Sequence, residues 1–253
     1  MLSKNKLKYI RSLAIKKFRD EEKAFIAEGP KLVEELIKYY ECSLLIGVPE
    51  YLKKIFPLKN TEVIEVNQEE LARASNLKTP QSVLAVFKMP MQPKINIPNI
   101  CQQLCLGLDA IQDPGNLGTI IRIADWFGIE HIFCSLDTVD AFSPKTVQAT
   151  MGAIGRVNIH YVALDEFLNQ LPKDFPIYGT FLDGQNIYSY RLPSQAMIVM
   201  GNEGKGISSR IEAVISDRLF IPNFPIERET SESLNVAVAT AITCAEFRRQ
   251  TLL

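Results

Sequence analysis

Short apolar runs alternate with amphipathic stretches along the first third of the chain. Continuous apolar runs are typical of buried strands, and apolar residues spaced three or four apart are typical of helices that pack on a sheet. Such alternation predicts helices on both faces of a small sheet. We expect strands at 42–48, 61–67 and 82–88, and helices at 3–18, 29–40, 49–56 and 68–75.

The same alternation returns on a larger scale after a segment at 91–100 that contains prolines and has no helical period. Such a segment is typical of a linker. We therefore divide the chain into a first α/β domain at 1–90, the linker, and a second domain at 101–253. The second domain is expected to be an open, mostly parallel α/β sheet. Its expected strands are 103–111, 131–136, 156–162, 176–182, 197–201 and 218–223, and its expected helices are 117–127, 143–152, 165–170, 208–214 and 234–249.

The last of these helices has small apolar residues on nearly every side, among them Ala237, Ala239, Ala241 and Ala245. A helix that is apolar all round is typically buried, whereas chain termini are typically exposed. The sequence therefore predicts that other segments wrap around this helix.

Positive charge gathers at the N-terminal end, although the whole chain has a net charge of −1. Residues 1–94 carry a net charge of +5 and the remainder carries −6. A basic edge on an acidic body fits an arm that binds phosphates, and it also fits a solvated amphipathic helix. The candidate phosphate-binding residues are Lys4, Lys6, Lys8, Arg11, Lys16, Lys17 and Arg19.

The cysteine content and the hydropathy of the chain indicate the cellular compartment of the protein. The five cysteines are scattered, and Cys101 and Cys105 have no second ligand pair nearby, so we expect reduced thiols and no zinc site. The chain shows no run long enough to span a membrane and no secretory signal. These features predict a cytoplasmic protein. His131 and His160 lie outside the candidate loops, and we expect both to be structural.

Three loops follow predicted strands, which is where open α/β sheets bind ligands. In the first, QDPGNLG at 112–118, we expect Asn116 to cap a helix that begins at Leu117. Leu117, Ile120, Ile121 and Ala124 mark the face of this helix that packs on the sheet, and Arg122 lies near the edge of that face. An arginine there can simply extend toward solvent, and a functional role is the alternative.

The second loop, IVMGNEGKGIS at 198–208, is rich in glycine and carries Glu203. Its glycine spacing does not match a nucleotide phosphate loop, and no dinucleotide fingerprint follows the first strand of this domain. Glu203 either caps a neighbouring helix or takes part in a site. In the third loop, after the strand at 218–223, we expect Ser233 to cap a helix that begins at Leu234.

The sequences DPGNLGTIIRIADWFG, VMGNEGKGIS and IP…SLNVAVATAI resemble, in order and in residues, the three motifs of the SpoU (TrmH-like) RNA ribose 2′-O-methyltransferases of the SPOUT class. The resemblance covers essentially the whole second domain, and the three motifs together are highly specific. IRSLAIKKFRDEEKAFIAEGPKLVEE and TPQSVLAVF are similar, more weakly, to the substrate-binding domain of many members. The basic residues of the first domain would then bind RNA.

The resemblance implies a trefoil-knotted α/β domain whose C-terminal helix is threaded through a loop, with S-adenosylmethionine bound in the knot. It also implies a homodimer in which two protomers share each site. The positions that match the family's cofactor contacts are Gly201, Ile221 and Leu234, and those that match its functional polar residues are Asn116, Arg122, Glu203, Ser233 and Asn235.

The implied reaction is an in-line displacement at the methyl group of a sulfonium, and it removes the positive charge on sulfur, so we expect no metal. The enzyme must align a ribose 2′-OH and remove its proton. Because a guanidinium keeps its own proton, we expect Arg122 to make the hydroxyl more acidic electrostatically and to bind the adjacent phosphate. Ser233 and Asn235 would orient the hydroxyl, and Glu203 would hold Arg122 or groups of the partner protomer.

The sequence departs from the family's pattern in NFPIERETSE at 223–232, which is longer than the corresponding family loop and lacks its glycine. This difference leaves open which residues near Ile221 contact the cofactor. The motifs do not identify the RNA, and the separate basic domain favours ribosomal RNA slightly over transfer RNA. A non-catalytic RNA-binding or ribosome-assembly protein on the same scaffold is the alternative, but it would not need the polar motif residues. A nucleotide-cofactor oxidoreductase would need the missing fingerprint.

Overall fold

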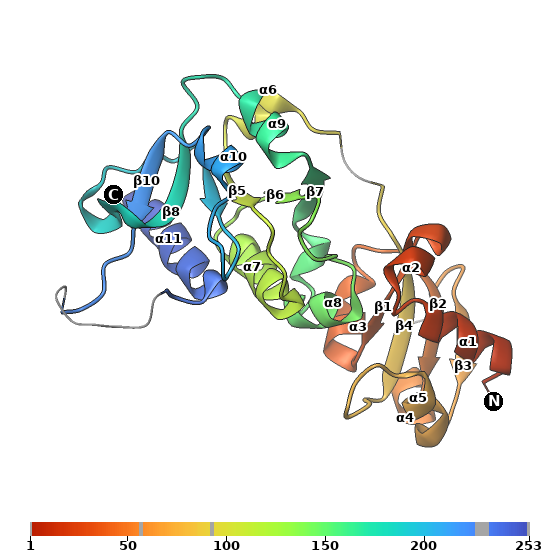
Figure 1. Ribbon diagram of the computed structural model, residues 1–253. Coiled ribbons are helices and arrows are strands. Elements are labelled where there is room, and N and C mark those ends of the chain that lie inside the picture. The colour runs from red at the N-terminus through yellow and green to blue at the C-terminus, as the bar shows by residue number, and fades with distance from the viewer. Residues whose placement is uncertain (1, 56–57, 92–93, 226–232, 252–253) are drawn as a thin grey trace. The chain divides into compact units, whose positions relative to one another are not determined.

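Two compact units make up the protein (Figure 1). The computed structural model describes residues 2–55, 58–91, 94–225 and 233–251. Unit 1 comprises Met1–Met91 and Asp140–Gly155, and unit 2 comprises Gln92–Val139 and Arg156–Leu253. The division of the sequence into 1–90, 91–100 and 101–253 stays a prediction, and residues 140–155 group here with the first unit rather than the second.

Unit 1 contains a four-stranded sheet in the order β1-β4-β2-β3. Strand β4 is antiparallel to β1 and β2, and β3 is parallel to β2. Helix α8 of the second chain segment packs on β1. The elements of the unit are α1 (Lys4–Ser12), α2 (Lys16–Glu22), β1 (Ala24–Glu28), α3 (Pro30–Leu36), β2 (Cys42–Gly47), α4 (Pro49–Leu52), β3 (Glu62–Glu65), α5 (Gln68–Ala74), β4 (Val83–Lys88), α8 (Pro144–Thr150) and η1 (Ala153–Gly155).

Two features of unit 1 differ from the sequence expectation. The single basic helix expected at 3–18 is two helices, because Leu13 turns inward and is completely buried where α1 ends. Strand β1 was not expected at all. Its residues are all buried, so it shows no alternation of apolar and polar positions, and it is too short to be told from a loop by periodicity alone.

Unit 2 contains a six-stranded sheet in the order β10-β8-β9-β5-β6-β7, and all its pairings are parallel. The expectation of an open, mostly parallel α/β sheet is confirmed. The elements are α6 (Ile97–Ile100), β5 (Leu104–Leu108), α7 (Pro114–Trp126), β6 (His131–Ser135), β7 (Asn158–Val162), α9 (Leu164–Asn169), β8 (Ile177–Asn186), η2 (Ile187–Ser189), β9 (Ala196–Met200), α10 (Ser209–Glu212), β10 (Asp217–Phe220) and α11 (Val236–Thr251).

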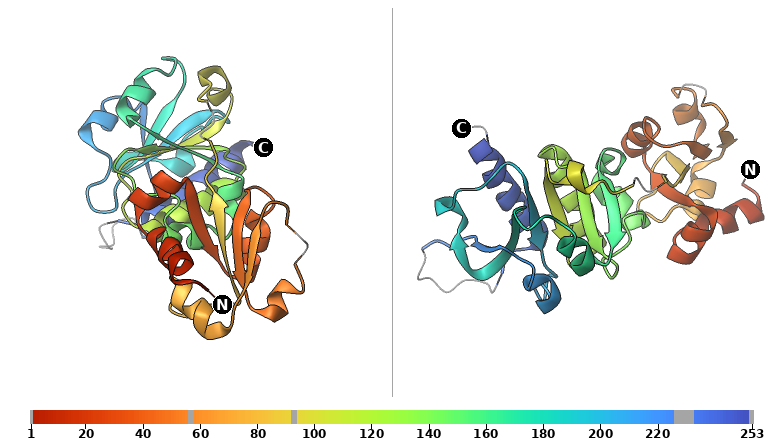
Figure 2. Two further views of the ribbon diagram at one scale, coloured as in Figure 1. Left: turned by 90° about the vertical axis from the view of Figure 1, so that its right-hand side faces the viewer. Right: turned by 90° about the horizontal axis from the view of Figure 1, so that it is seen from above.

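Helices cover both faces of the second sheet (Figure 2). Helices α7 and α11 lie side by side on one face, where the Phe247 ring meets Tyr178 of β8 at a centroid distance of 5.4 Å. Helices α9 and α10 pack on the other face, where Phe167 stacks on Phe133 of β6 at 4.2 Å. No helix in the described part of the chain is long and apolar enough to cross a membrane.

The expectation that the last helix is buried on every side is wrong. In α11, Thr240, Cys244 and Phe247 are completely buried, whereas Val238 is 49% exposed and Ala245 is also exposed. Some of the small apolar residues of this helix therefore pack against the sheet, and others lie on an open stripe that faces solvent. The segment before β9 does cross the far end of the helix, because Gln250 exchanges hydrogen bonds with Tyr190 O and Leu192 N, both 2.9 Å long.

Candidate active site

The three motif loops follow β5, β9 and β10 of unit 2. Loop I is 109–113, loop II is 201–208 and loop III is 221–235, of which 226–232 lie outside the described residues. Because these strands are parallel, their carboxyl ends meet at one edge of the sheet. This is the edge at which open α/β sheets bind ligands.

A chain of side-chain hydrogen bonds joins the three motifs. Asn116 Nδ2 donates to Glu203 Oε1 at 2.9 Å, and Asn235 Nδ2 donates to Asn116 Oδ1 at 3.0 Å. The three residues come from α7, loop II and the start of α11, and are separated by 87 and 119 positions in the chain. The structure therefore brings together three of the five predicted polar residues.

Glu203 also sits at the N-terminal end of α7. Its carboxylate accepts the backbone N–H groups of Gln112 at 3.4 Å and Asp113 at 3.5 Å. A negative charge at this end of a helix interacts favourably with the unpaired N–H groups there. Within one chain Glu203 therefore holds loop I and Asn116, and the expectation that it holds Arg122 is not met. A contact with a partner protomer stays a prediction.

The helix caps differ from those expected. Helix α7 begins at Pro114, and Asp113 caps it by accepting the N–H of Asn116 at 2.9 Å. Proline suits the first helical position because it lacks an N–H to satisfy, so the helix begins three residues earlier than Leu117. The cap assigned to Asn116 is therefore wrong, and its side chain is available to Glu203 and Asn235.

Asn235, rather than Ser233, caps α11. Its Oδ1 accepts the N–H groups of Ala237 at 3.0 Å and Val238 at 3.3 Å. The helix begins at Val236, two residues after the predicted start. Ser233 is exposed and has no hydrogen bond to any described residue, which leaves its hydroxyl accessible.

Arg122 points away from this network. It lies six residues after Asn116 on α7, which places it roughly 120° away around the helix and about 9 Å along it. The side chain is exposed, and no described residue forms a hydrogen bond or ion pair with it. It shares one exposed stripe with Thr119 and Trp126, of which Trp126 is 84% exposed.

The three predicted cofactor positions supply backbone and apolar groups. A Cβ at Gly201 would lie 2.3 Å from the carbonyl carbon of Gly206 and 2.4 Å from Ile207 N. The backbone at the end of β9 therefore packs directly against loop II, which leaves no room for a side chain at Gly201. Ile221 is half-buried at the end of β10, and Leu234 is 48% exposed before α11. This donor set fits S-adenosylmethionine, whose adenine ring needs apolar surfaces and backbone hydrogen bonds.

Asn202 is a site residue that the sequence reasoning missed. Its Nδ2 donates to Ala110 O at 2.7 Å, and its Oδ1 accepts the N–H groups of Gly204 and Lys205 at 3.0 Å. Ala110 adopts a left-handed backbone conformation, with φ of 55°. Asn202 therefore ties loop II to loop I. The signal was an asparagine at the start of a glycine turn, where its side chain commonly bonds to nearby backbone.

The seven basic residues predicted to bind phosphates fall into three groups. Lys6, Lys16 and Lys17 form ion pairs at the surface, and Arg11 Nε donates to Arg73 O at 2.9 Å. Lys4 and Lys8 are exposed and have no partner among the described residues. Arg19 is 2% exposed and paired with Asp140, so its guanidinium does not face solvent.

The half-buried His131 and the buried His160 form a pair on β6 and β7, away from the three loops. His131 Nδ1 lies 3.0 Å from His160 Nε2, and the His160 ring stacks on Phe133 at 4.8 Å. Burial, with a smaller effect of His131, lowers the pKa of His160 to about 4, and burial also lowers the pKa of His131. These contacts fit the structural role expected for both.

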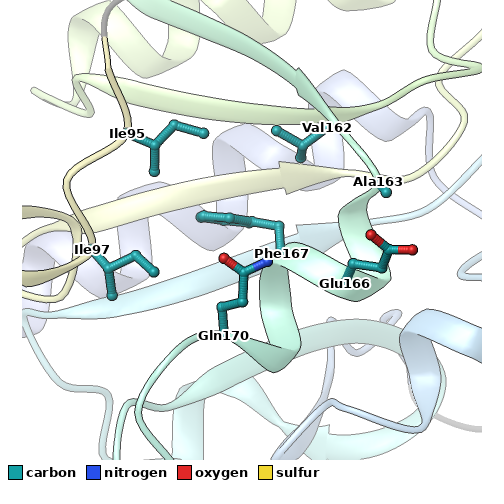
Figure 3. Close-up of a pocket in the computed structure, with 7 residues that line it drawn as sticks. All are labelled: Ile95, Ile97, Val162, Ala163, Glu166, Phe167 and Gln170. Carbon is teal, nitrogen blue, oxygen red and sulfur yellow. The ribbon is translucent and has the colours of Figure 1, made fainter.

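A separate hollow of about 240 Å³ lies between α9 and the segment before α6 (Figure 3). Ile95, Ile97, Val162 and Phe167 form its apolar walls, and Glu166 and Gln170 border it. It contains none of the motif residues and is not the candidate active site.

The parallel sheet and its three joined motif loops define an α/β methyltransferase of the SPOUT class. Two family models match the chain: the SpoU rRNA Methylase family at residues 103–245 and the MRM3-like substrate binding domain at residues 4–85. The chain belongs to the SpoU rRNA methylase family. It is an RNA 2′-O-ribose methyltransferase that uses S-adenosylmethionine.

Relatives match nearly the whole chain. It is 29% identical to the 23S rRNA (guanosine(2553)-2′-O)-methyltransferase RlmP of Bacillus subtilis over 96% of both chains. It is 31% identical to the mitochondrial rRNA methyltransferase 3 of Mus musculus over 92% of this chain and 69% of that one.

Solved structures of similar proteins support the same family. A structure assigned to the TrmH family from Porphyromonas gingivalis has a TM-score of 0.87 and 44% identity and covers 99% of each chain. An AdoMet-bound rRNA methyltransferase from Sinorhizobium meliloti has a TM-score of 0.83 and 30% identity, and covers 100% of this chain and 98% of that one.

Proposed function

We propose that this enzyme methylates a ribose 2′-OH in the large-subunit ribosomal RNA, as a homodimer in which each site takes groups from both protomers. The observation that carries the proposal is the Glu203–Asn116–Asn235 network, because it draws the three motif loops together at the ligand-binding edge of the sheet. Large-subunit RNA is supported by the Bacillus subtilis relative, whose name gives 23S rRNA as its substrate.

S-adenosylmethionine supplies the methyl group when it is bound. Backbone groups at Gly201 and Ile221 would hold it, and the exposed Leu234 side chain would cover an apolar surface of it. We place these contacts within a trefoil knot around α11. The expected absence of a metal and the contacts of loop 223–232, most of which lies outside the described residues, stay predictions.

The polar residues would divide the remaining work. Asn235 uses its Oδ1 to cap α11 and one Nδ2 hydrogen to hold Asn116, so its second Nδ2 hydrogen is left for the ribose. Ser233 offers an exposed hydroxyl beside it. Arg122 would bind the phosphate next to the reacting nucleotide and favour loss of the 2′-hydroxyl proton electrostatically.

The direction of Arg122 supports the shared site. Because Arg122 points away from Asn116 on the same helix, it would serve the network of a second protomer. Helices α7 and α11 are neighbours, and each has an exposed stripe, which carries Arg122 and Trp126 on α7 and Val238 and Ala245 on α11. A partly apolar surface of this kind fits an isologous contact between two copies of the chain.

The RNA would first meet unit 1. Lys4 and Lys8 are exposed cations of α1 with no partner among the described residues, and Arg11, Lys16 and Lys17 are also exposed on α1 and α2. Such residues bind phosphates without reading sequence. We place the enzyme in the cytoplasm with its RNA.

The test is methyl transfer from labelled S-adenosylmethionine to an unmodified large-subunit rRNA transcript, followed by alkaline hydrolysis. A 2′-O-methyl group blocks attack on the neighbouring phosphate, so the label should remain in an alkali-resistant dinucleotide. Label in mononucleotides would mean base methylation and would refute the proposed position. Transfer to transfer RNA alone would refute the proposed substrate.

A further inference from the structure

Ala110, the second residue of loop I, has a strained backbone. Its φ is 55°, in the left-handed region that residues with a Cβ rarely adopt. Such a conformation persists only where the surrounding structure holds it. Two residues later, the N–H groups of Gln112 and Asp113 meet the carboxylate of Glu203. The backbone of Ala110 therefore decides the direction in which the rest of loop I leaves the sheet.

Two side chains from neighbouring strands of unit 2 hold Ala110. Strand β5 lies between β9 and β6 in the sheet, and the end of each neighbour supplies one hydrogen bond. Ser135 is the last residue of β6, and its Oγ accepts the N–H of Ala110 at 2.8 Å. Asn202 follows β9, and its Nδ2 donates to the carbonyl oxygen of Ala110 at 2.7 Å. Both polar groups of the strained residue are thus bonded to side chains.

The Ser135 hydroxyl is arranged as an acceptor for this bond. It donates its single proton to Asp137 Oδ1 at 2.6 Å. The hydrogen bond of 3.0 Å between Ser135 Oγ and Thr138 Oγ1 must then be donated by Thr138. Both lone pairs of Ser135 therefore accept hydrogens, one from Thr138 and one from Ala110. Ser135 is 8% exposed, and a hydrogen bond in such surroundings is electrostatically stronger than one in water.

This arrangement sets the position of loop I relative to loop II. Asn202 belongs to the loop that carries Glu203, so the two loops are joined at Ala110 as well as at Asn116. Methyl transfer needs its reacting groups aligned closely, and a small displacement of a loop can lower the rate many-fold. A residue that fixes the backbone of Ala110 therefore contributes to the geometry of the site.

We propose that Ser135 is a positioning residue for methyl transfer, because its hydroxyl holds Ala110 and with it the backbone that leads to Asn116. The inference rests on the proposed function of the Glu203–Asn116–Asn235 network beside the reacting ribose. A glycine at position 110 would adopt the left-handed backbone without steric strain. With alanine there, the position of loop I depends on Ser135.

The test is a double-mutant cycle in the full chain. Ser135→Ala removes the acceptor of the Ala110 N–H. Ala110→Gly removes the steric strain, so that the remaining bond from Asn202 should suffice to hold the backbone. The cycle measures Ser135→Ala alone and together with Ala110→Gly. Ser216→Ala is the matched control, because Ser216 Oγ accepts the N–H of Ile177 at 3.2 Å at the opposite edge of the same sheet, where β8 begins.

The readouts are kcat and KM with the unmodified large-subunit rRNA transcript, and amide hydrogen exchange of Ala110. Ser135→Ala should lower kcat about ten-fold with KM within two-fold, and the Ala110 amide should exchange roughly five-fold faster. In the presence of Ala110→Gly, the same substitution should lower kcat by less than about three-fold relative to Ala110→Gly alone. Ser216→Ala should match the wild type in kcat and in the exchange of Ala110.

An unchanged kcat in folded Ser135→Ala would overturn the inference, and so would a change confined to KM, which would indicate a role in RNA binding. An equal fall of kcat with and without Ala110→Gly would also overturn it, because a general loss of structure does not depend on residue 110. Unchanged exchange at Ala110 would overturn it without any RNA. Failure of the wild type to methylate the transcript would count against the proposed function alone, and the exchange measurement would still decide whether Ser135 holds loop I.

Discussion

Asn235 Nδ2 donates to Asn116 Oδ1 at 3.0 Å, although the two residues are 119 positions apart. The bond joins the start of the last helix to the first motif, and Asn116 passes the connection on to Glu203. Asn235 also caps α11 through its Oδ1. One side chain therefore has a structural role and a role in the site, and substitutions can separate the two.

Asn235→Asp should separate the role of Asn235 as the cap of α11 from its hydrogen bond to Asn116. An aspartate keeps the oxygen that caps α11 but has no N–H for Asn116 and places a second carboxylate near Glu203. We expect the free energy of unfolding to stay within about 0.5 kcal/mol and kcat to fall roughly 100-fold. Asn235→Ala, the comparison variant, should in addition lose about 1 kcal/mol of stability with the cap. Full activity of Asn235→Asp would show that the bond to Asn116 is dispensable.

Arg122→Ala should abolish methyl transfer without affecting folding. The side chain is exposed and has no partner among the described residues, so its removal should change the unfolding free energy by less than about 0.5 kcal/mol. Binding of S-adenosylmethionine, followed by calorimetry, should remain. Loss of cofactor binding in this variant would contradict the assigned role.

Mixed dimers test whether the sites are shared. Arg122→Ala and Asn116→Ala should each be inactive alone. A mixture of the two should regain activity, because a dimer with one copy of each variant contains one complete site and one site that lacks both groups. A statistical mixture should reach about a quarter of the wild-type rate, since half of its dimers are mixed and each has one working site. No recovery after verified exchange of subunits would indicate that both residues act within one protomer.

Gly201→Ala should destabilise unit 2. A Cβ at this position would lie 2.3 Å from Gly206 and would force apart the two hydrogen bonds between Asn202 and Gly206. We expect a loss of about 1–3 kcal/mol in urea unfolding. Gly204→Ala in the same loop is the control, because its Cβ would meet only Asn202 Oδ1 at 3.7 Å. Equal effects of the two substitutions would contradict this account.

The pair formed by the buried His160 and the half-buried His131 predicts a pH dependence of stability. Burial lowers the pKa of His160 to about 4, so between that value and about 6.5 the unfolded chain binds a proton that the folded protein does not. The free energy of unfolding should therefore fall as the pH drops from 6.5 toward 4, by at most about 3 kcal/mol from this group. Above pH 6.5 both states are neutral and the effect is absent. Urea unfolding of the wild type and His160→Leu at pH 5 and pH 7 would measure it, and an equal pH dependence in both would assign it to other groups.

The local sequence pattern predicted most helices and strands, but it misplaced the residues at which several of them begin and end. The six strands of the second sheet follow from apolar runs, and the buried face of α7 follows from the spacing of Leu117, Ile120, Ile121 and Ala124. Both caps next to the site were misplaced, because asparagine, aspartate and serine all serve as caps and the choice depends on which backbone N–H groups lie nearby. Strand β1 was missed because complete burial removes the alternation that marks a strand.

The sequence by itself determined the class of fold, the three motifs and the polar residues that carry them, because periodicity and short motifs report local geometry. Only the tertiary structure decided that Glu203 meets Asn116 rather than Arg122, that Arg19 is buried against Asp140, and that α11 keeps an open stripe. These facts depend on where separate strands end and how helices rotate about their axes. The strand ends and helix rotations result from the packing of the whole unit. The local sequence around each residue does not show which distant residue it will contact.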